Sequence, residues 1–344
     1  MTALYVTSLA EGAGKTTICA GLAKHLLSSG KKVGFFKPIV ADIKSPLEAI
    51  DHDAAFIRHI LALEEPVENL CPVISDHNTL ANSIKEAYAK VSKGKDVVIV
   101  EGVWRQRPGG KPIEACYEIV EALDAKVIIV EGYSGELSTA KHINTYKDFG
   151  EYLLGVVLNK VPPSRLDSVS TDSQFSEAGI NILGVLPEDR MLFALSVGEL
   201  AEHLQGEILN SMEKSGELVE NFMLGAMTVD PGPEYFSRKA NKAVVVKGER
   251  PDMQMAALET SMRCLILSGN TAPIPAVQYR AEGKDVPLIV VKGDTMATVT
   301  AIEKALDKTR FNQVKKLTKL TEIMEKHFNF QTVYQGLVWM ALLS

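Results

Sequence analysis

Cysteines and long apolar segments are both scarce in this sequence of 344 residues. Its four cysteines, Cys19, Cys71, Cys116 and Cys264, lie far apart and form no CxxC pair. We therefore expect neither a zinc site nor a disulfide framework, and we interpret the four as buried, reduced thiols of a cytoplasmic protein. The apolar run VYQGLVWMALLS reaches about a dozen residues, which is short of the ~20 that a membrane-spanning helix needs.

Basic residues are outnumbered as well. The chain has 37 Lys and Arg against 43 Asp and Glu, which gives a net charge of −6. This balance disfavours nucleic acid as the main partner, because phosphate backbones attract basic surfaces. Strand-like sequence starts at Ala3, where a secretory leader would need a basic region followed by an apolar one. We expect a cytoplasmic protein with a sizeable core.

Short apolar segments alternate with helical patterns through the first two hundred residues. The segments that read as buried strands are ALYVTS, KVGFFKP, DVVIVEG, KVIIVEG, LLGVVLNK and NILGVLP. Between the first two, Ile18, Leu22 and Leu26 fall on one helical face. The alternation predicts an α/β fold with a doubly wound parallel sheet, whose ligands bind at the carboxyl ends of the strands.

A second, smaller α/β unit follows a change in composition. AVVVKGERPD, CLILSGNTAP and PLIVVKGDTM each run from an apolar strand into a glycine and a polar turn. We place the domains at 1–205 and 223–310, joined by a polar linker at 206–222 and followed by a helical tail at 311–344. The tail either packs on its own domain or forms a subunit contact. We expect a homodimer, formed through the second unit or this tail.

The segment SLAEGAGKTT follows the first predicted strand. In the pattern G-x-x-x-x-G-K-[ST], backbone amides wrap phosphates, the lysine reaches their terminal oxygens and the hydroxyl binds Mg²⁺. Leu9 replaces the first glycine of this pattern, while the helix that starts near Lys15 presents its N-terminus to an anion. A Gly-rich turn that only connects strand and helix is the alternative. The residues expected to bind nucleotide phosphates are Gly12, Ala13, Gly14, Lys15, Thr16 and Thr17.

Acidic and polar side chains end several of the predicted strands. Mg²⁺ bound with a nucleotide usually takes one or two carboxylates, and Glu101 and Glu131 each end a strand in the same motif, VEG. Asp53 is a third candidate, or simply an acid at a helix start. Lys37, after the second strand, faces an anion or lies exposed on the surface. Asn159 ends LLGVVLNK, where its amide can hydrogen-bond a purine edge.

These segments together resemble the dethiobiotin synthetase branch of P-loop proteins. They are more similar still to the dethiobiotin-synthetase-like domain that begins long bacterial phosphate acetyltransferases. The motifs that carry the resemblance are YVTSLAEGAGKTT, FFKPI, DHDAAFI, VVIVEG, VVLNKVP and LGVLPEDRMLFALSVGELAEHL. The resemblance implies that Lys15, Thr16, Asp53 and Glu101 serve phosphate and Mg²⁺. It also implies that Asn159 lies at the base and that Lys37 matches the lysine that handles the carbamate in true synthetases.

One departure from the synthetases concerns the substrate pocket. In synthetases a Gly-Ala-Gly-Gly run follows the strand-end Glu, whereas here VEG continues as VWRQRPGGKP, with Trp104, Arg105 and Arg107. This difference argues against activity on the biotin precursor.

The second half resembles the DRTGG domain, through KAVVVKGERPDMQMAALETSMRCLILSGN. Glu249 and Arg250 stand where Asp and Arg are usual, and Ser268, Gly269 and Asn270 where Thr-Gly-Gly is usual. The resemblance implies a regulatory role, with a second small ligand at loops that comprise Gly248, Glu249, Arg250, Ser268, Gly269 and Asn270. A phosphate acetyltransferase needs a further catalytic domain after this region, so we expect no transferase activity from this sequence on its own.

Three functions follow from these observations. The first is a regulator that binds ATP (or GTP) with Mg²⁺ and controls a partner of acetyl-phosphate or acetyl-CoA metabolism. The second is an ATP-dependent enzyme that activates a carboxylate or carbamate, with Lys15 and Lys37 as its catalytic residues. The third is a scaffold whose nucleotide site is vestigial, as Leu9 would suggest.

Overall fold

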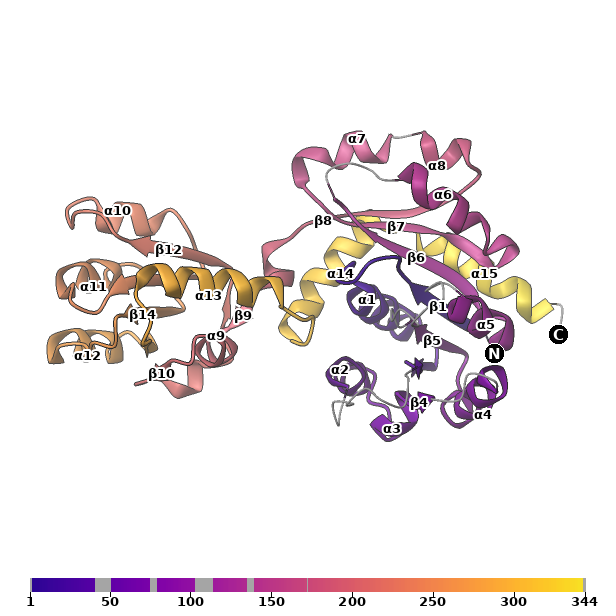
Figure 1. Ribbon diagram of the computed structural model, residues 1–344, viewed down its shortest axis with the longest axis horizontal. Coiled ribbons are helices and arrows are strands. Elements are labelled where there is room, and N and C mark those ends of the chain that lie inside the picture. Colours follow the sequence, from indigo (N-terminus) through magenta and orange to yellow (C-terminus); the bar gives the residue numbers. More distant parts are fainter. Residues whose placement is uncertain are drawn as a thin grey trace. The chain divides into compact units, whose positions relative to one another are not determined.

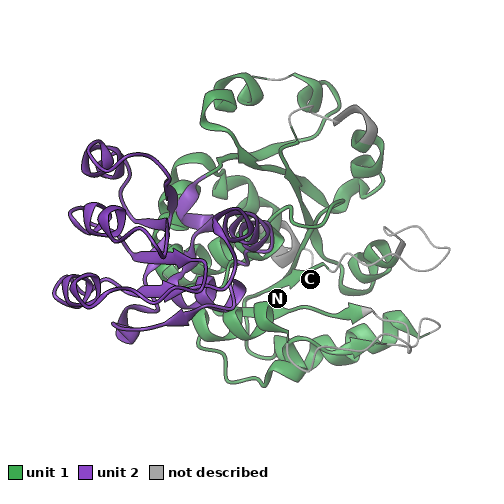
Figure 2. Ribbon diagram, turned by 60° about the vertical axis from the view of Figure 1, so that its left-hand side comes forward, with its two compact units in different colours: residues 1–188, 311–344 green, residues 189–310 purple. Residues whose placement is uncertain are grey.

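The computed structural model describes residues 2–40, 51–74, 79–102, 114–134, 139–171 and 173–342 (Figure 1). The chain divides into two compact units (Figure 2). Unit 1 consists of Met1–Glu188 and Phe311–Ser344, and unit 2 of Asp189–Arg310. Among the helices in these described ranges, none combines the length and the hydrophobicity needed to span a lipid bilayer.

Unit 1 is built on a parallel sheet, which confirms the predicted fold class. In the described ranges it has six strands in the order β2-β5-β1-β6-β7-β8. Valine and isoleucine fill its central strands, whose side chains are buried on both faces because helices cover both. The strands are β1 (Thr2–Thr7), β2 (Val33–Phe36), β5 (Val97–Glu101), β6 (Lys126–Gly132), β7 (Leu153–Val161) and β8 (Ile182–Pro187).

Helices and short elements connect these strands. The helices are α1 (Lys15–Ser28), α2 (His52–Ile60), α3 (Val67–Leu70), α4 (Leu80–Ser92), α5 (Glu114–Leu123), α6 (Thr139–Lys147), α7 (Leu166–Ser170) and α8 (Gln174–Glu177). Two short strands, β3 (Ile39–Val40) and β4 (Val73–Ile74), pair with each other. Single 3₁₀ turns lie at η1 (Gly150–Tyr152) and η2 (Pro163–Arg165).

The C-terminal helices pack on unit 1. Figure 1 shows α14 (Lys315–His327) beside α1, and the backbone of Phe328 forms a bridge with Gly184 of β8. The ring of His25 on α1 stacks on Phe330 of α15 (Phe330–Leu342), with 3.5 Å between ring centroids. The tail therefore belongs to unit 1, which is one of the two roles that its amphipathic pattern allows.

Unit 2 has a smaller sheet in the order β10-β15-β14-β13-β12. Its strands are β10 (Glu207–Ile208), β12 (Asn221–Gly225), β13 (Lys242–Lys247), β14 (Cys264–Ser268) and β15 (Leu288–Val290), and all pair in parallel except β10. Alternate residues of β13 face opposite apolar clusters: Val244 and Val246 face one, Ala243 and Val245 the other. Such alternation is what a sheet covered on both faces requires.

The remaining elements of unit 2 surround that sheet. The helices are α9 (Val197–His203), α10 (Gly232–Ser237), α11 (Pro251–Leu258), α12 (Pro275–Glu282) and α13 (Thr295–Asp307). Strands β9 (Leu195–Ser196) and β11 (Leu218–Val219) pair antiparallel. The 3₁₀ turns η3 (Arg190–Phe193) and η4 (Met212–Lys214) complete the unit.

The limits of the two units differ from those that the composition suggests. Unit 2 begins at Asp189, and the polar segment 206–222 carries β10, β11 and the start of β12. These strands are short, and most of their neighbours in the chain are half-buried or exposed. A two-residue strand at the edge of a sheet needs few apolar side chains, because its outer edge is exposed to water. Its composition therefore does not distinguish it from a linker.

Candidate functional site

The loop between β1 and α1 adopts left-handed backbone at two glycines. Gly12 has a φ of 69° and Gly14 a φ of 99°, a region in which other residues are strained. Leu9 is half-buried and does not have a positive φ. The position of the first pattern glycine therefore needs no glycine in this chain, and the leucine leaves the turn intact.

The N-terminus of α1 is open to an anion. Gly14 is the N-cap, no side chain caps the helix, and this described segment has no acid in the first turn. The free amides and the helix dipole therefore favour negative charge here. Lys15 folds back over the loop, since its Nζ donates to Ser8 Oγ at 2.8 Å. Burial lowers the pKa of Lys15, with the charge of Glu101 acting in the opposite direction.

Asn159 braces the loop from the end of β7. Its Nδ2 donates to the carbonyl of Ala13 at 2.8 Å, and the residue is only 7% exposed. A Cβ on Gly14 would lie 2.2 Å from that Nδ2, so the close approach requires glycine. On the neighbouring strand, a Cβ on Gly132 would lie 3.5 Å from Ala13 Cα. Sequence reasoning places Asn159 at a base and misses this contact, because nothing local links it to the loop.

Thr16 and Glu101 meet directly. The Thr16 hydroxyl donates to Glu101 Oε1 at 2.8 Å, and Glu101 itself is 2% exposed at the end of β5. Its second oxygen, Oε2, is buried and has no hydrogen-bond partner in the part of the chain that the structure describes. Burial raises the pKa of Glu101, while Lys37 acts to lower it. A buried carboxylate with a spare acceptor marks a place where a cationic partner fits.

Lys37 lies among three carboxylates. Its Nζ is 2.8 Å from Asp53, 3.1 Å from Asp51 and 3.5 Å from Glu101. The side chain is 9% exposed, so the alternative of a surface lysine is wrong. Burial acts to lower the pKa of Lys37, but the three acids outweigh it and the net shift is upward. Asp51 is a residue that sequence reasoning missed. It caps α2 by accepting a bond from Ala54 N at 2.8 Å.

Glu131 takes a different place from Glu101, although both end a strand in VEG. Its carboxylate contacts His142 Nδ1 at 3.2 Å and accepts a bond from the Tyr146 hydroxyl. In the parallel register, Glu101 and Ile128 are both level with Val6 of β1, so Glu131 lies three residues further along. Because side chains alternate between faces along a strand, this odd offset turns Glu131 to the opposite face.

The oxygen atoms of Thr16, Asp53 and Glu101 suit a hard cation such as Mg²⁺. Across the described ranges, no group of three or more His, Cys, Asp or Glu residues could hold a metal ion by itself. Two carboxylates and one hydroxyl are instead the partial donor set that Mg²⁺ takes when phosphates and water complete its shell. The unpartnered Glu101 Oε2 supplies a free acceptor for such an ion. The residues present therefore fit Mg²⁺ bound together with a phosphate ligand.

The carboxyl ends of the strands in unit 2 carry loops that bond to each other. Gly248 N donates to Ser268 O at 2.8 Å, and Gly269 N donates to Gly293 O at 2.8 Å. The Ser268 and Thr295 hydroxyls are 2.9 Å apart. Gly269 and Asn270 have φ values of 92° and 54°, which suits a Gly-Asn pair.

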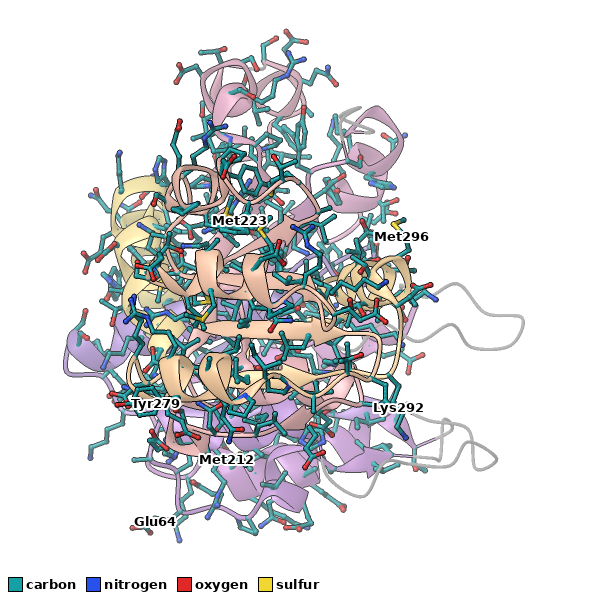
Figure 3. All side chains as sticks on the ribbon, turned by 90° about the vertical axis from the view of Figure 1, so that its left-hand side faces the viewer. Glu64, Met212, Met223, Tyr279, Lys292 and Met296 are labelled. Atoms are coloured by element: carbon teal, nitrogen blue, oxygen red, sulfur yellow. The ribbon has the colours of Figure 1, made fainter. Side chains whose placement is uncertain are left out.

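Side chains tighten the same loops. Arg250 holds Asp252 through its Nη2 at 2.8 Å and donates to the carbonyl of Met227 at 3.2 Å. The amide of Gln254, which is fully buried, donates to the carbonyls of residues 247 and 248 at 3.0 Å each. Lys292 and Met296 are exposed in this region (Figure 3). Most of the polar groups here thus have partners within unit 2.

Residues 2–194 match the AAA domain family AAA_26. The chain belongs to this AAA-domain family. Residues 199–305 match the DRTGG domain. The chain therefore has a P-loop nucleotide-binding AAA domain followed by a DRTGG domain, as its resemblances imply.

Curated relatives of the chain include two phosphate acetyltransferases. That of Nitrosomonas europaea is 24% identical over 354 residues, which cover 95% of this chain and 50% of that protein. That of Pseudomonas aeruginosa is 23% identical over 371 residues, which cover 97% and 52%. The chain spans about half the length of the curated relatives it matches.

A solved structure is similar at a TM-score of 0.30 and 15% identity. It contains the CBS and DRTGG domains of the regulatory region of Clostridium perfringens pyrophosphatase, complexed with the activator diadenosine tetraphosphate. The similarity covers 58% of this chain and 85% of that chain.

The AAA domain brings together most of the residues singled out in the sequence. Direct contacts join Thr16, Glu101, Lys37 and Asp53, while Lys15 bonds Ser8 of the loop. Asn159 bonds the loop at Ala13. In the DRTGG domain, Gly248, Arg250, Ser268 and Gly269 lie in the bonded loops. Glu249 instead pairs with Lys247 at 2.6 Å on the surface. Trp104, Arg105 and Arg107 lie outside the described residues.

Proposed function

We propose that the chain is a regulatory protein that binds ATP together with Mg²⁺, GTP being the alternative nucleotide. One observation carries the proposal. The left-handed loop and the uncapped N-terminus of α1 lie directly beside Glu101, a buried carboxylate that Thr16 contacts. An anion site next to a cation site is the arrangement that a metal-bound nucleotide needs.

Each residue has a role in this proposal. The backbone amides of residues 12–17 bind the phosphates, because they form the loop and the N-terminus of α1. The Lys15 ammonium, which lies over the loop, binds the phosphates as well. Thr16, Asp53 and Glu101 hold the cation. When bound, Mg²⁺ neutralises phosphate charge. Asn159 orients the loop through Ala13 and lies beside the base.

The regulatory part of the proposal rests on the DRTGG domain. Its loops would take a second small ligand around Gly248, Glu249, Arg250, Ser268, Gly269 and Asn270, whose bonded geometry would have to open for it. Homology to phosphate acetyltransferases supports a partner in acetyl-phosphate or acetyl-CoA metabolism. We further propose that the protein acts in the cytoplasm as a homodimer. Allosteric regulation would require each of the two ligands to change the affinity of the protein for the other.

Calorimetric titration with ATP and with GTP in the presence of Mg²⁺ tests this function, with phosphate release followed in parallel. We expect binding with little phosphate release, and we expect Lys15→Ala to abolish the binding. Lys24→Ala is the matched control, because Lys24 is exposed on the same helix. If neither nucleotide binds the wild-type protein, the proposal is wrong and the chain is a scaffold with a vestigial site.

A second function is favoured by one contact. Lys37 lies 3.5 Å from Glu101, so a second lysine stands beside the proposed cation donors. Two lysines and Mg²⁺ around a transferring phosphoryl group would stabilise its charge, as an enzyme that activates a carboxylate or carbamate requires. Phosphate release that one small carboxylic acid stimulates many-fold would establish this function instead of the regulator.

A further inference from the structure

Lys37 and the proposed cation share two carboxylates. The Lys37 ammonium lies 2.8 Å from Asp53 and 3.5 Å from Glu101, and these two carboxylates are the ones that would ligate Mg²⁺. Lys37 contacts Asp53 Oδ2 and Glu101 Oε1, so a divalent cation bound to the other oxygens of these acids would lie close to the ammonium and repel it. This repulsion favours the release of Lys37 from the two acids.

The charges around Lys37 do not balance. Three carboxylates, those of Asp51, Asp53 and Glu101, surround Lys37, and they outnumber the ammonium groups even when Lys15, whose charge also acts on Glu101, is counted. The acid side chains are only 3–23% exposed, so water screens this excess weakly. Glu101 Oε2 is buried and unpartnered within the described residues, which shows where the neutralisation is incomplete. One divalent cation would more than offset this excess, so its arrival would weaken the attraction between the acids and Lys37.

Asp51 offers the displaced lysine a fixed partner. Its carboxylate contacts Lys37 at 3.1 Å and is held in place by the backbone amide of Ala54 at 2.8 Å. No contact in the described residues links Asp51 to Thr16 or Glu101. Lys37 could therefore leave Asp53 and Glu101 and stay bonded to Asp51.

We propose that Lys37 is the resident counter-ion of the cation site. A divalent cation displaces it from Asp53 and Glu101, and the ammonium, still in contact with Asp51, then turns toward an anionic group of the bound ligand. This inference rests on the proposed function, because it assigns an order to the same site. The cation binds first. Its arrival frees Lys37 to act, together with Lys15, as a second lysine that donates to the anionic ligand.

Direct binding of Mn²⁺ without nucleotide, followed by the electron paramagnetic resonance of free Mn²⁺, tests the competition. We expect Lys37→Gln to bind Mn²⁺ at least about tenfold more tightly than wild type, because a competing charge within 4 Å is gone. Lys24→Gln is the matched control. It removes an ammonium that is exposed to solvent on α1, and its effect should stay below about threefold. Equal or weaker binding by Lys37→Gln would overturn the inference.

A measurement on the wild-type protein covers the case in which Lys37→Gln does not fold. Acetylation of Lys37 by acetic anhydride, read by mass spectrometry, should become several-fold faster with saturating Mg²⁺, since the amine loses two of its three acid partners. An unchanged rate would contradict the displacement. The proposed function fails separately: it is wrong if nucleotide does not bind, whatever the Mn²⁺ affinities of the two variants show.

Discussion

The two sheets of this protein end in loops of opposite character. At the carboxyl edge in the AAA domain, α1 has no side-chain cap, and a buried carboxylate oxygen of Glu101 has no partner among the described residues. At the corresponding edge of the DRTGG domain, Asp294 caps α13 and Arg250 is bonded to Asp252. The first edge leaves the start of α1 and a carboxylate oxygen open, whereas most polar groups at the second edge bond to one another. Exceptions at the second edge are Gln254 Oε1, which is buried without a partner among the described residues, and the start of α11, which has no side-chain cap.

The difference shows that a shared architecture does not decide what an edge does. Both sheets are mainly parallel, and both have glycines where strands give way to helices. In the AAA domain, the two left-handed glycines leave the N-terminus of α1 open. In the DRTGG domain, loop amides such as that of Gly248 already bond a neighbouring loop. A ligand at the first edge therefore finds free backbone amides, although Lys37 must leave two of its acid partners to admit a cation.

The largest effect is expected from Gly14→Val. Valine at a φ of 99° is strained, and its Cβ would lie 2.2 Å from Asn159 Nδ2. We expect a loss of about 3 kcal/mol in the free energy of unfolding and no detectable nucleotide binding. Urea unfolding and calorimetric titration measure the two effects.

Gly12→Ala is the control for that substitution. Gly12 is also left-handed, but a Cβ there would meet nothing within 4 Å. Only the backbone strain applies, and we expect a loss of about 1 kcal/mol. If the two variants lose the same free energy of unfolding, the close approach of Asn159 to residue 14 does not contribute to the loss.

Gln254→Ala is expected to act on the other edge alone. The substitution leaves the carbonyls of residues 247 and 248 without their buried donor. We expect unfolding of the DRTGG domain to become about 2 kcal/mol easier. Nucleotide affinity, measured by titration, should stay within about twofold. A larger loss of affinity would show that the DRTGG loops support the nucleotide site.

The smallest effect is expected from Glu131→Gln and depends on pH. Burial raises the pKa of Glu131, with His142 acting against it, so the folded protein holds this proton more tightly than the unfolded chain. That contribution is fully present below the ordinary glutamate pKa of about 4.3 and is lost as pH rises through the raised value. Glutamine has no such proton. Urea unfolding between pH 4 and pH 6 should therefore show wild type losing stability relative to the variant, whereas a constant difference would contradict the shift.

Local sequence patterns predict much of this molecule. The six main strands of the AAA domain, the loop at Gly12–Thr17 and the strand-end position of Glu101 all follow from short segments, because periodicity and turn residues act locally. Local patterns do not predict which of Glu101 and Glu131 lies beside the loop between β1 and α1. Both end a strand in VEG, and only the register against β1 turns them to opposite faces.

Contacts between segments that lie far apart in the chain could not be predicted from the sequence either. The bond from Asn159 to Ala13 joins residues 146 positions apart. Asp51 contacts Lys37, which lies 14 positions earlier in the chain, and no local pattern predicts this pairing. The short edge strands of 206–222 have too few apolar residues to be distinguished from a linker. In each case the missing information is tertiary.

Hydrogen exchange read by mass spectrometry tests the central claim most directly, which is that nucleotide binds at the loop between β1 and α1. With saturating nucleotide and Mg²⁺, peptides covering residues 8–18 should exchange more slowly, because bound phosphates occupy the free amides of the loop and helix start. Peptides from α4 (80–92) serve as the internal reference and should not change. Unchanged exchange at residues 8–18, at a nucleotide concentration where calorimetry shows full binding, would contradict the account and place the nucleotide elsewhere.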